Sequence, residues 1–248
     1  MVEDAPPARF YIARHGQRTD FHVPNWTDEQ HSTPEGRPQD PPLTPEGLRQ
    51  AACLGVKLKQ CVEEIGVPIT RIICSPFTRC VQTAAGAADG LGIDRICIDW
   101  GFAEYMNNSW YKVWDAHKLV SNGSVVPHPT ELLKTAQELR DTVETRVDPT
   151  YQSLSSIDRT IGFENPETWS GMQKRVRNML RLLQEHYPGE HILLVGHGAT
   201  VECANEILCP DAISGGYEVA YASLSIAEKS KKDPKEWKMC LIADTSHY

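Results

Sequence analysis

Short apolar segments alternate along this chain with longer amphipathic ones, and this alternation constrains the fold more than any other feature of the sequence. Several of the short segments are apolar at every position, as in strands that are buried on both faces of a sheet. The predicted strands cover residues 10–13, 71–74, 93–98, 192–195, 219–227 and 237–243. We therefore predict an α/β fold, a three-layer sandwich in which helices flank a mostly parallel six-stranded sheet.

Three helices are expected between these strands. The clearest has Thr44 as its N-terminal cap and Pro45 in its first position, carries apolar residues at three- and four-residue intervals, and ends at Gly66. A second helix begins near residue 75, and a third covers about 169–187 before a Pro-Gly pair ends it. The third helix is expected to expose its basic residues to solvent: Lys174, Arg175, Arg177 and Arg181.

The length of 248 residues suits a single domain over 1–248, but two stretches do not follow the alternation. Residues 21–42 contain five prolines and no periodicity, which predicts a functional or disordered loop after the first strand. Residues 100–167 interrupt the strand and helix order, and we expect them to form an insertion that caps the sheet. This insertion begins with a group of aromatic residues: Trp100, Phe102, Tyr105, Trp110, Tyr111 and Trp114.

The chain carries 25 Lys and Arg against 33 Asp and Glu, which gives a net charge of −8. Attraction to nucleic acid or to an anionic membrane needs a surplus of basic residues, so neither is an expected partner. The first ten residues have no apolar core and no long apolar run follows, which predicts neither a signal peptide nor a membrane span. We expect a cytoplasmic protein whose eight scattered cysteines are buried free thiols.

Three predicted strands end in basic residues. The first strand runs into Arg14, His15 and Arg18, the second leads to Arg79, and the fourth leads to His197. Ligands of open α/β sheets bind beyond the carboxyl ends of the strands, where these side chains would converge if the strands are neighbours. Such a cluster in an acidic protein predicts a local pocket for an oxyanion.

Each residue type suits phosphate chemistry. Arginine presents a planar fork of donors that matches two phosphate oxygens and stays charged. Histidine titrates near pH ~6.5, so His15 can be neutral and nucleophilic while His197 donates a hydrogen bond to the anion. Gly16 and Gly198 would let backbone and phosphate approach closely, and a helix that begins near Ala199 would direct its free N–H groups at the same point.

Other catalytic signatures are absent from the sequence. It contains no GxxxxGK[ST], GxGxxG or GxSxG motif, which argues against a P-loop, a dinucleotide fold and a serine hydrolase. Only four residues separate Cys74 from Arg79, whereas a cysteine phosphatase loop needs five. No HExxH motif occurs, and we expect neither a metal ion nor a cofactor.

Four blocks in order along the chain resemble the histidine phosphatase superfamily, which includes cofactor-dependent phosphoglycerate mutases and many phosphatases. These blocks are ARHGQR (13–18), LTPEGLRQA (44–52), ICSPFTRCVQTA (73–84) and VGHGATVE (195–202). Within the superfamily, RHGxRxD followed by Trp26, together with SPxxRCVQTA, is most similar to the phosphatase domain of ubiquitin-associated and SH3-domain-containing proteins. The ecdysteroid-phosphate phosphatases are close relatives of that group.

The resemblance implies a phosphoglycerate mutase-like fold and a role for each site residue. It identifies His15 as the residue that becomes phosphorylated and Glu104 as the proton donor. The implied phosphate pocket consists of Arg14, Arg18, Arg79 and His197. Where close relatives usually have glutamate after RHG, this sequence has Gln17, which removes an acid from that position and leaves the pocket intact.

These residues together predict a metal-independent phosphomonoester hydrolase that acts through phosphohistidine on phosphotyrosine-like or other bulky apolar phosphates. Its partners would be a phosphorylated small molecule or a phosphoprotein, and a homodimer is one candidate oligomeric state. Two alternatives stay open. One is a phosphoglycerate mutase-type phosphotransferase, although the ERxYG-type stretch of the family's mutases is replaced here by Glu104-Tyr-Met-Asn-Asn. The other is a catalytically weak module that only binds phosphorylated partners.

Overall fold

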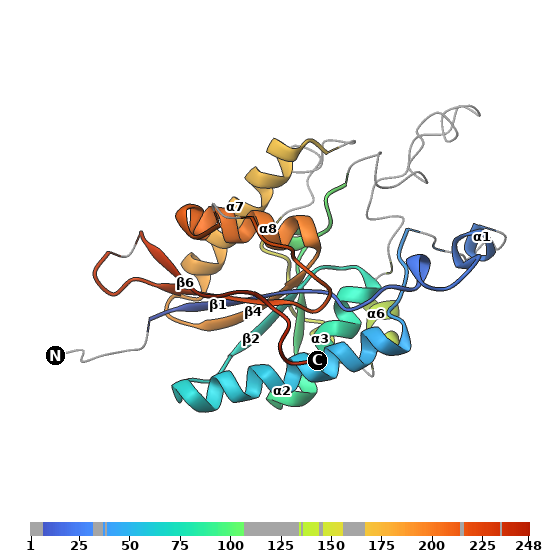
Figure 1. Cartoon of the computed structure of the whole chain (residues 1–248), viewed down its shortest axis with the longest axis horizontal. Coiled ribbons are helices and arrows are strands. Elements are labelled where there is room, and N and C mark those ends of the chain that lie inside the picture. Colours follow the sequence, from blue (N-terminus) through green and yellow to red (C-terminus); the bar gives the residue numbers. More distant parts are fainter. Residues whose placement is uncertain are drawn as a thin grey trace.

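A six-stranded sheet with the strand order β3-β2-β4-β1-β5-β6 forms the centre of the computed structural model (Figure 1). The structure describes residues 7–31, 37, 39–106, 134, 136–143, 146–155, 167–213, 216–233 and 235–248. The strands are β1 (Arg9–Arg14), β2 (Arg71–Cys74), β3 (Ile96–Ile98), β4 (His191–Gly196), β5 (Leu224–Lys229) and β6 (Trp237–Asp244). The α-helices are α1 (Trp26–His31), α2 (Pro45–Ile65), α3 (Thr78–Leu91), α6 (Ala136–Thr142), α7 (Trp169–His186) and α8 (Gly198–Leu208). Short 3-10 helices cover η1 (Thr19–Phe21), η2 (Trp100–Phe102) and η4 (Pro210–Ile213).

The sheet is mixed and mostly parallel, as predicted. β4 lies parallel to both β1 and β2, and β2 lies parallel to β3. Only β5 among the six strands runs in the opposite direction, because it pairs antiparallel with β1 and with β6. The carboxyl ends of β1, β2 and β4 therefore meet at one edge of the sheet.

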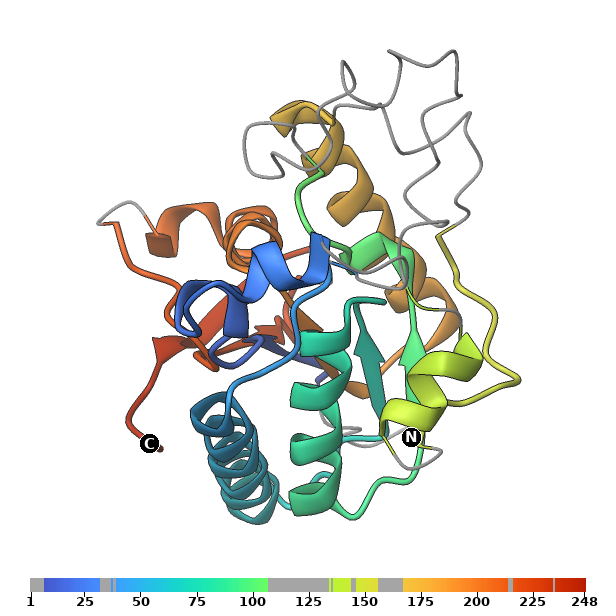
Figure 2. The same ribbon diagram turned by 90° about the vertical axis from the view of Figure 1, so that its right-hand side faces the viewer.

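Helices cover both faces of the sheet. α2 and α3 lie side by side on one face, and α7 and α8 lie on the other (Figures 1 and 2). Alternate residues of β1 point to opposite sides: Tyr11 and Ala13 pack in the core under α2 and α3, and Phe10 and Ile12 pack in the core under α7 and α8. This alternation explains why the central strands are apolar throughout, since both of their faces are buried.

The helix α2 forms as its sequence predicts. The hydroxyl of Thr44 accepts a hydrogen bond from the Gly47 N–H, Pro45 occupies the first turn, and Gly66 ends the helix at φ 70°. Its partner α3 ends at Gly92 in the same left-handed conformation.

Two predicted strand boundaries are wrong. β5 begins at Leu224 and not at residue 219, because Ala222 adopts φ 50° and the N–H of Ala222 bonds to the carbonyl of His15. β3 begins at Ile96 and not at residue 93, because the N–H of Ile93 still bonds back to Ala88 at the end of α3.

One basic residue of α7 was wrongly predicted to be exposed. Lys174, Arg177 and Arg181 are exposed, but Arg175 is only 7% exposed. Arg175 follows Met172 by three residues and precedes Met179 by four, so it lies on the buried stripe of the helix.

The two irregular stretches contain more structure than the sequence predicted. Residues 21–42 include the helix α1, so this part is not structureless. Within 100–167, η2, α6 and residues 146–155 are described, and Trp100 and Phe102 pack in the two cores. Trp110, Tyr111 and Trp114 lie outside the described residues.

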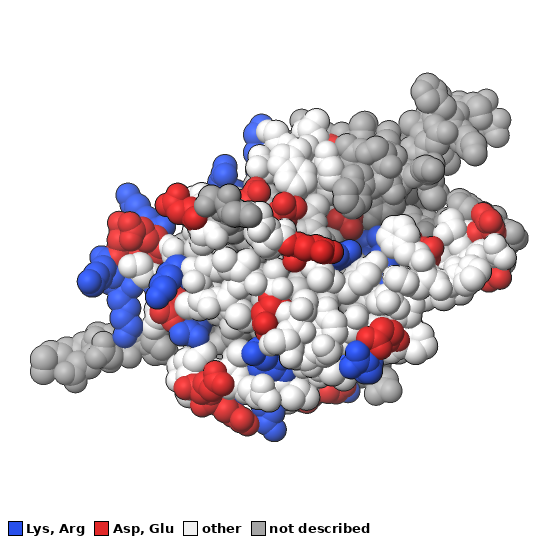
Figure 3. Space-filling model, in the orientation of Figure 1, with Lys and Arg blue, Asp and Glu red and all other residues white. Residues whose placement is uncertain are grey.

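All eight cysteines are free, and six of them are buried as predicted, while Cys53 is half-buried and Cys240 is exposed. Basic and acidic side chains are mixed over the face seen in Figure 3. None of the helices in the described part of the chain is both long and apolar enough to cross a bilayer.

Candidate active site

The basic residues at the ends of β1, β2 and β4 come together at one edge of the sheet. His15 follows β1, Arg79 lies in the first turn of α3 after β2, and His197 follows β4. Their side chains are almost fully buried, with 1%, 0% and 0% of their surface exposed. The parallel register of the three strands fixes this convergence, which was predicted from the sequence.

The imidazole of His15 is oriented by its own loop. Its Nδ1 lies 2.7 Å from the carbonyl oxygen of Gly16, which can only accept a hydrogen bond, so Nδ1 carries the proton. The Nε2 atom therefore keeps its lone pair. Burial, and then the charge of Arg79, lower the pKa of His15 well below its usual value of 6.5. His15 is thus a neutral imidazole at neutral pH, as a nucleophile must be.

The loop after β1 is held in place by α3 and α2. The N–H of Gly16 donates to the Thr83 hydroxyl at 3.0 Å, and this hydroxyl donates to the Arg79 carbonyl at 2.8 Å. A Cβ at Gly16 would lie 2.6 Å from the carbonyl oxygen of Gly47. Glycine is therefore required at position 16 for the close approach of α2.

His197 connects the pocket to Glu104. Its Nε2 lies 2.8 Å from the Ser75 hydroxyl, and its Nδ1 lies 3.1 Å from Oε2 of Glu104 and 3.1 Å from Nη2 of Arg79. Burial, opposed by the charge of Glu104 and reinforced by that of Arg79, lowers the pKa of His197 to about 4. His197 is neutral at neutral pH, and Nδ1–H is the tautomer that donates to the carboxylate.

The carboxyl group of Glu104 is buried beside two potential cations. Burial alone would raise its pKa, but the hydrogen bond with His197 and the charge of Arg79 outweigh burial and lower the pKa below its usual range. The N–H of Tyr105 also donates to Oε1 at 3.0 Å. Glu104 is therefore a carboxylate in this structure, and its Oε2 lies toward His197 and Arg79.

Arg14 and Arg18 lie at the same edge but differ in their surroundings. The Nη1 of Arg14 donates to the Val219 carbonyl at 2.7 Å, its guanidinium lies 4.3 Å from the ring centre of Tyr221, and its Nε is buried without a hydrogen-bond partner among the described residues. The guanidinium of Arg18 is bound by both carboxylate oxygens of Asp20 at 2.6 Å. Arg14 thus keeps a donor for an anion, whereas a phosphate would compete with Asp20 for Arg18.

The buried groups could also hold a metal ion. One nitrogen of His15, one of His197 and one oxygen of Glu104 lie within 4.8 Å of one another, which is a suitable ligand set for a divalent metal. Nη2 of Arg79 contacts two of these ligands, at 3.1 Å and 3.4 Å, so a metal ion there would be repelled by the guanidinium. The arrangement favours an anion over a cation.

Cys80 is a further buried nucleophile in the site, with its sulfur 3.4 Å from Nε2 of His197. Burial raises the pKa of Cys80 to about 12, so its thiol remains protonated at neutral pH. The neutral imidazole of His15 is therefore better suited than the Cys80 thiol to act as a nucleophile.

Several site residues were missed by the sequence reasoning. Ser75 and Thr83 lie inside the ICSPFTRCVQTA block, and Asp20 lies two residues after Arg18, so their positions in motifs were the available signal. Tyr221 and Arg175 come from segments with no motif. The spacing of Arg175 from Met172 and Met179 could have indicated its burial, but not its partners.

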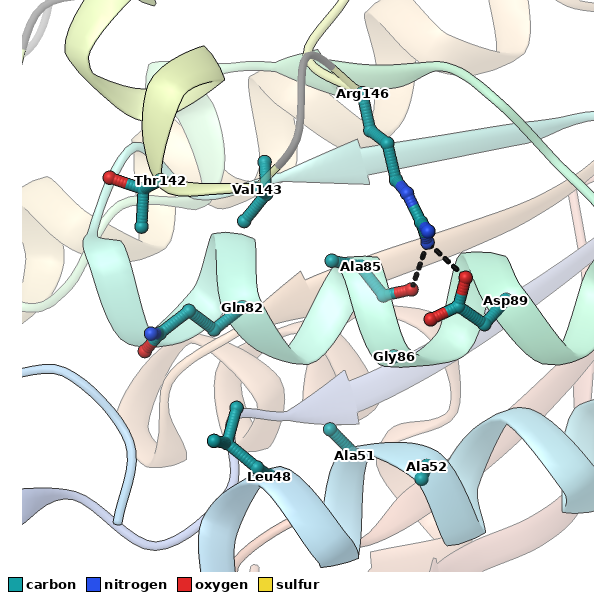
Figure 4. A pocket seen from close by; sticks show the side chains of 10 residues that line it. All are labelled: Leu48, Ala51, Ala52, Gln82, Ala85, Gly86, Asp89, Thr142, Val143 and Arg146. Atoms are coloured by element: carbon teal, nitrogen blue, oxygen red, sulfur yellow. Dashed lines mark hydrogen bonds and ion pairs between the residues drawn. The ribbon is translucent and has the colours of Figure 1, made fainter. Parts of the chain in front are cut away.

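Two hollows lie outside the cluster of buried residues. One of about 400 Å³ lies between α2, α3 and the end of α6, where Arg146 bonds to the Ala85 carbonyl and to Asp89 (Figure 4). Another of about 500 Å³ is lined by Trp26, Arg37, Asp40 and Thr78 among others, next to Arg79. The hollow lined by Trp26 therefore adjoins the site. The hollow between α2 and α3 is lined by none of the described site residues.

The chain is similar in sequence to known phosphatases and signalling proteins. Over 257 residues the chain is 27% identical to the ecdysteroid-phosphate phosphatase of Drosophila melanogaster, covering 89% of this chain and 30% of the relative. It is 24% identical over 262 residues to the Homo sapiens ubiquitin-associated and SH3 domain-containing protein A, covering 92% of this chain and 36% of the relative. The chain thus spans about a third of the length of these curated relatives.

Solved structures show the same fold. The ecdysone phosphate phosphatase of Bombyx mori in complex with tungstate superimposes with a TM-score of 0.68 at 20% identity, over 96% of this chain and 93% of that one. A phosphoglycerate mutase of Bacillus anthracis gives a TM-score of 0.56 at 19% identity, over 98% and 96%. These likenesses establish the predicted phosphoglycerate mutase-like architecture.

The sequence profile of the histidine phosphatase superfamily (branch 1) matches residues 10–121 and 132–240, which together span most of the chain and include every residue of the buried cluster. The fold and the convergent strand ends described above are consistent with this match. The chain therefore belongs to branch 1 of the histidine phosphatase superfamily.

Proposed function

We propose that this protein hydrolyses phosphomonoesters through a phosphohistidine at His15, without a metal ion. The observation that carries this proposal is the buried, neutral imidazole of His15, which lies in a cluster with His197 and Glu104, two side chains that Arg79 contacts. A nucleophile without a proton, next to fixed positive charge, is what attack on a phosphate dianion requires.

In the first step, the Nε2 lone pair of His15 attacks phosphorus and the bond to the leaving oxygen breaks. Arg79 and Arg14 stabilise the charge on the phosphoryl oxygens, and the N-terminus of α8, which begins at Gly198, adds backbone dipoles. A Cβ at Gly198 would lie 3.6 Å from Nε of Arg14, so glycine keeps the space beside this guanidinium open. The resemblance implies that Arg18 also belongs to this pocket. Its guanidinium would then bind phosphate in place of Asp20.

Glu104 would supply the proton for the leaving oxygen. It is ionised in the structure because Arg79 and His197 lower its pKa. A bound phosphate dianion brings two negative charges next to the same groups, which offsets their effect and raises the pKa of Glu104. Binding of the substrate thus prepares the acid.

In the second step, the Glu104 carboxylate left by proton transfer takes a proton from water, and the water oxygen attacks phosphorus. The bond to Nε2 breaks and inorganic phosphate leaves, which restores neutral His15 and protonated Glu104. The same pocket serves both steps because the transferred group is the same.

The proposed substrates are phosphotyrosine-like or other bulky apolar phosphomonoesters. Phe21 is 69% exposed and lies 4.7 Å from the guanidinium of Arg18, and Tyr221 covers Arg14. These rings offer apolar surface beside the phosphate-binding residues, worth roughly 25 cal/mol per Å² that a leaving group covers. Trp100 and Phe102, two of the aromatic residues grouped at 100–114, pack in the cores and so do not offer a surface to the leaving group. A relative named for an ecdysteroid phosphate supports the same class.

The proposal is tested by measuring phosphate release from para-nitrophenyl phosphate and from a panel of aryl, peptide, steroid and sugar phosphates. We expect activity that survives EDTA, is inhibited by vanadate or tungstate, and is at least about tenfold higher in kcat/KM for bulky apolar esters than for sugar phosphates. Alkaline quenching should trap phosphohistidine in the wild type and not in His15→Ala.

Two outcomes would contradict the proposal. Activity that EDTA abolishes and Mg²⁺ or Zn²⁺ restores would show that a metal ion is needed. Conversion of 3-phosphoglycerate to its isomer without phosphate release would identify a mutase, and absence of any turnover would favour a module that only binds phosphorylated partners.

A further inference from the structure

Arg175 on α7 directs its guanidinium at the backbone segment that carries Glu104. It donates to the carbonyl oxygens of Gly101 at 3.1 Å, Ala103 at 2.9 Å and Glu104 at 3.1 Å. These residues lie more than 70 positions away in the sequence, on the segment between β3 and the site. One buried side chain of the helix layer thus holds most of the backbone that leads to the proposed acid.

The carboxylate of Glu167 completes this arrangement. It binds Arg175 through two bonds of 2.8 Å, to Nε and Nη2, and both side chains are almost fully buried. The same carboxylate accepts the N–H of Met106 at 3.1 Å, and the N–H of Glu167 donates to the Met106 carbonyl at 2.9 Å. Arg175 therefore fixes the chain up to Glu104, and Glu167 fixes it two residues later.

The start of the segment is fixed as well. The buried carboxylate of Asp99 accepts hydrogen bonds from the N–H of Gly101, the hydroxyl of Tyr151 and the N–H of Leu154, at 2.7–2.8 Å. With residues 99, 101, 103, 104 and 106 all bound, the main-chain position of Glu104 is set on both sides. Its side chain then reaches His197 and Arg79, and the N–H of Tyr105 donates to its carboxylate.

From these contacts we propose that Arg175 is the positioning residue for the carboxyl group of Glu104, and this inference rests on the proposed hydrolase. An arginine is suited to the task because its planar fork can bind a carboxylate on one side and carbonyl groups on the other. Lysine offers a single ammonium group, which cannot meet both sets of acceptors in the same geometry.

A positioning role for Arg175 has a kinetic consequence that a role in core stability alone does not have. Proton transfer to a leaving oxygen needs the acid within hydrogen-bond reach, so a small displacement of Glu104 slows that transfer steeply. The attack by His15 does not pass through this segment. Loss of Arg175 is therefore expected to slow esters that need protonation and to spare an ester whose leaving group departs unaided.

The experiment compares kcat/KM for phenyl phosphate and para-nitrophenyl phosphate, because kcat/KM includes only the steps up to phosphohistidine formation. We expect Arg175→Lys to lower kcat/KM for phenyl phosphate by about 10-fold to 100-fold and for para-nitrophenyl phosphate by less than about 3-fold. Arg177→Gln is the matched control, since it removes an exposed arginine of the same helix and should change neither value.

A double variant tests whether Arg175 acts through Glu104. In the Glu104→Gln background, Arg175→Lys should add no further difference between the two esters. Equal losses for both esters, or a second full loss for phenyl phosphate in the double variant, would overturn the inference.

If Arg175→Lys does not fold, as judged by thermal unfolding and tungstate binding, Glu167→Gln replaces it. This variant keeps an acceptor for Met106 and weakens the hold on Arg175, so it must show the same selective loss for phenyl phosphate. Equal rates for Glu167→Gln and the wild type would overturn the inference. A wild-type protein that hydrolyses neither ester would overturn the proposed function too, whereas hydrolysis with unselective losses would overturn only the role of Arg175.

Discussion

The two halves of the candidate site are built in different ways. The nucleophile half, residues 14–18 with His197, follows directly from strand ends and is held by neighbours in the loop and in α3. The acid half, residues 99–106, follows the edge strand β3 and is held by Arg175 and Glu167 from α7 and the segment before it. The first half is oriented by the sheet, and the second by a buried ion pair outside the sheet.

This difference has a consequence for chemistry. A change in the nucleophile half should affect every substrate alike, because in the proposed mechanism each reaction begins with the attack by His15. A change in the acid half should depend on the leaving group, because only poor leaving groups need the proton of Glu104. The ratio of the rates for two esters thus reports which half has been disturbed.

Replacement of the nucleophile tests the comparison most severely. His15→Ala is expected to lower kcat by at least about 10⁴-fold for phenyl phosphate and para-nitrophenyl phosphate alike, because no other group in the site can form the covalent intermediate. Steady-state rates and the thermal unfolding of the variant provide the measurement and its control. Retention of a tenth of the wild-type rate would rule out the covalent route.

Replacement of the acid should give an unequal result. Glu104→Gln is expected to lower kcat/KM for phenyl phosphate by about 10²-fold, whereas para-nitrophenyl phosphate should lose only a few-fold. Glu63 is an exposed residue of α2, and Glu63→Gln serves as the control for removal of a carboxylate. Similar losses for both esters would place the proton donor elsewhere.

Acid should destabilise the nucleophile half through its buried histidines. The pKa of His197 is about 4 in the folded protein and near 6.5 when unfolded, so the unfolded state binds the proton first as pH falls. Stability is then lost between pH 6.5 and 4, by up to about 3 kcal/mol from this residue. Thermal unfolding measured across this range should show that the free energy of unfolding changes less steeply with pH in His197→Gln than in the wild type. In the exposed control His186→Gln, this slope should equal that of the wild type. An unchanged slope in His197→Gln would show that folding does not lower the pKa of His197.

The smallest expected effect concerns the support of the nucleophile loop. Thr83→Val leaves the buried N–H of Gly16 without its acceptor, which should cost about 1–3 kcal/mol of unfolding free energy. Both esters should slow by the same factor, because the change lies in the nucleophile half. Thr142→Val is the control, since the Thr142 hydroxyl also donates to a carbonyl of its own helix but does not hold a catalytic loop. A selective loss for phenyl phosphate in Thr83→Val would contradict the division into halves.

Local sequence patterns predicted the helix α2 and the central strands because their signals are local. Thr44, Pro45 and Gly66 mark the ends of α2 by capping and backbone geometry. The same reasoning failed at Arg175, since its charge suggested solvent exposure although its spacing from Met172 and Met179 placed it on the buried stripe. Local reasoning also failed at the start of β5, because Ala222 has a positive φ and its N–H bonds to the carbonyl of His15, a residue far away in the sequence.

The sequence by itself determined which side chains meet: Arg14, His15, Arg79 and His197 follow apolar strands, and parallel strands bring their carboxyl ends to one edge. Tertiary structure alone decided the state in which they meet. The tautomer of His15, the ionisation of Glu104 and the contacts of Arg175 depend on distances of about 3 Å between groups far apart in the chain. Hydrogen bonds and pKa values are set by such through-space distances, and a linear pattern of residue types does not contain them.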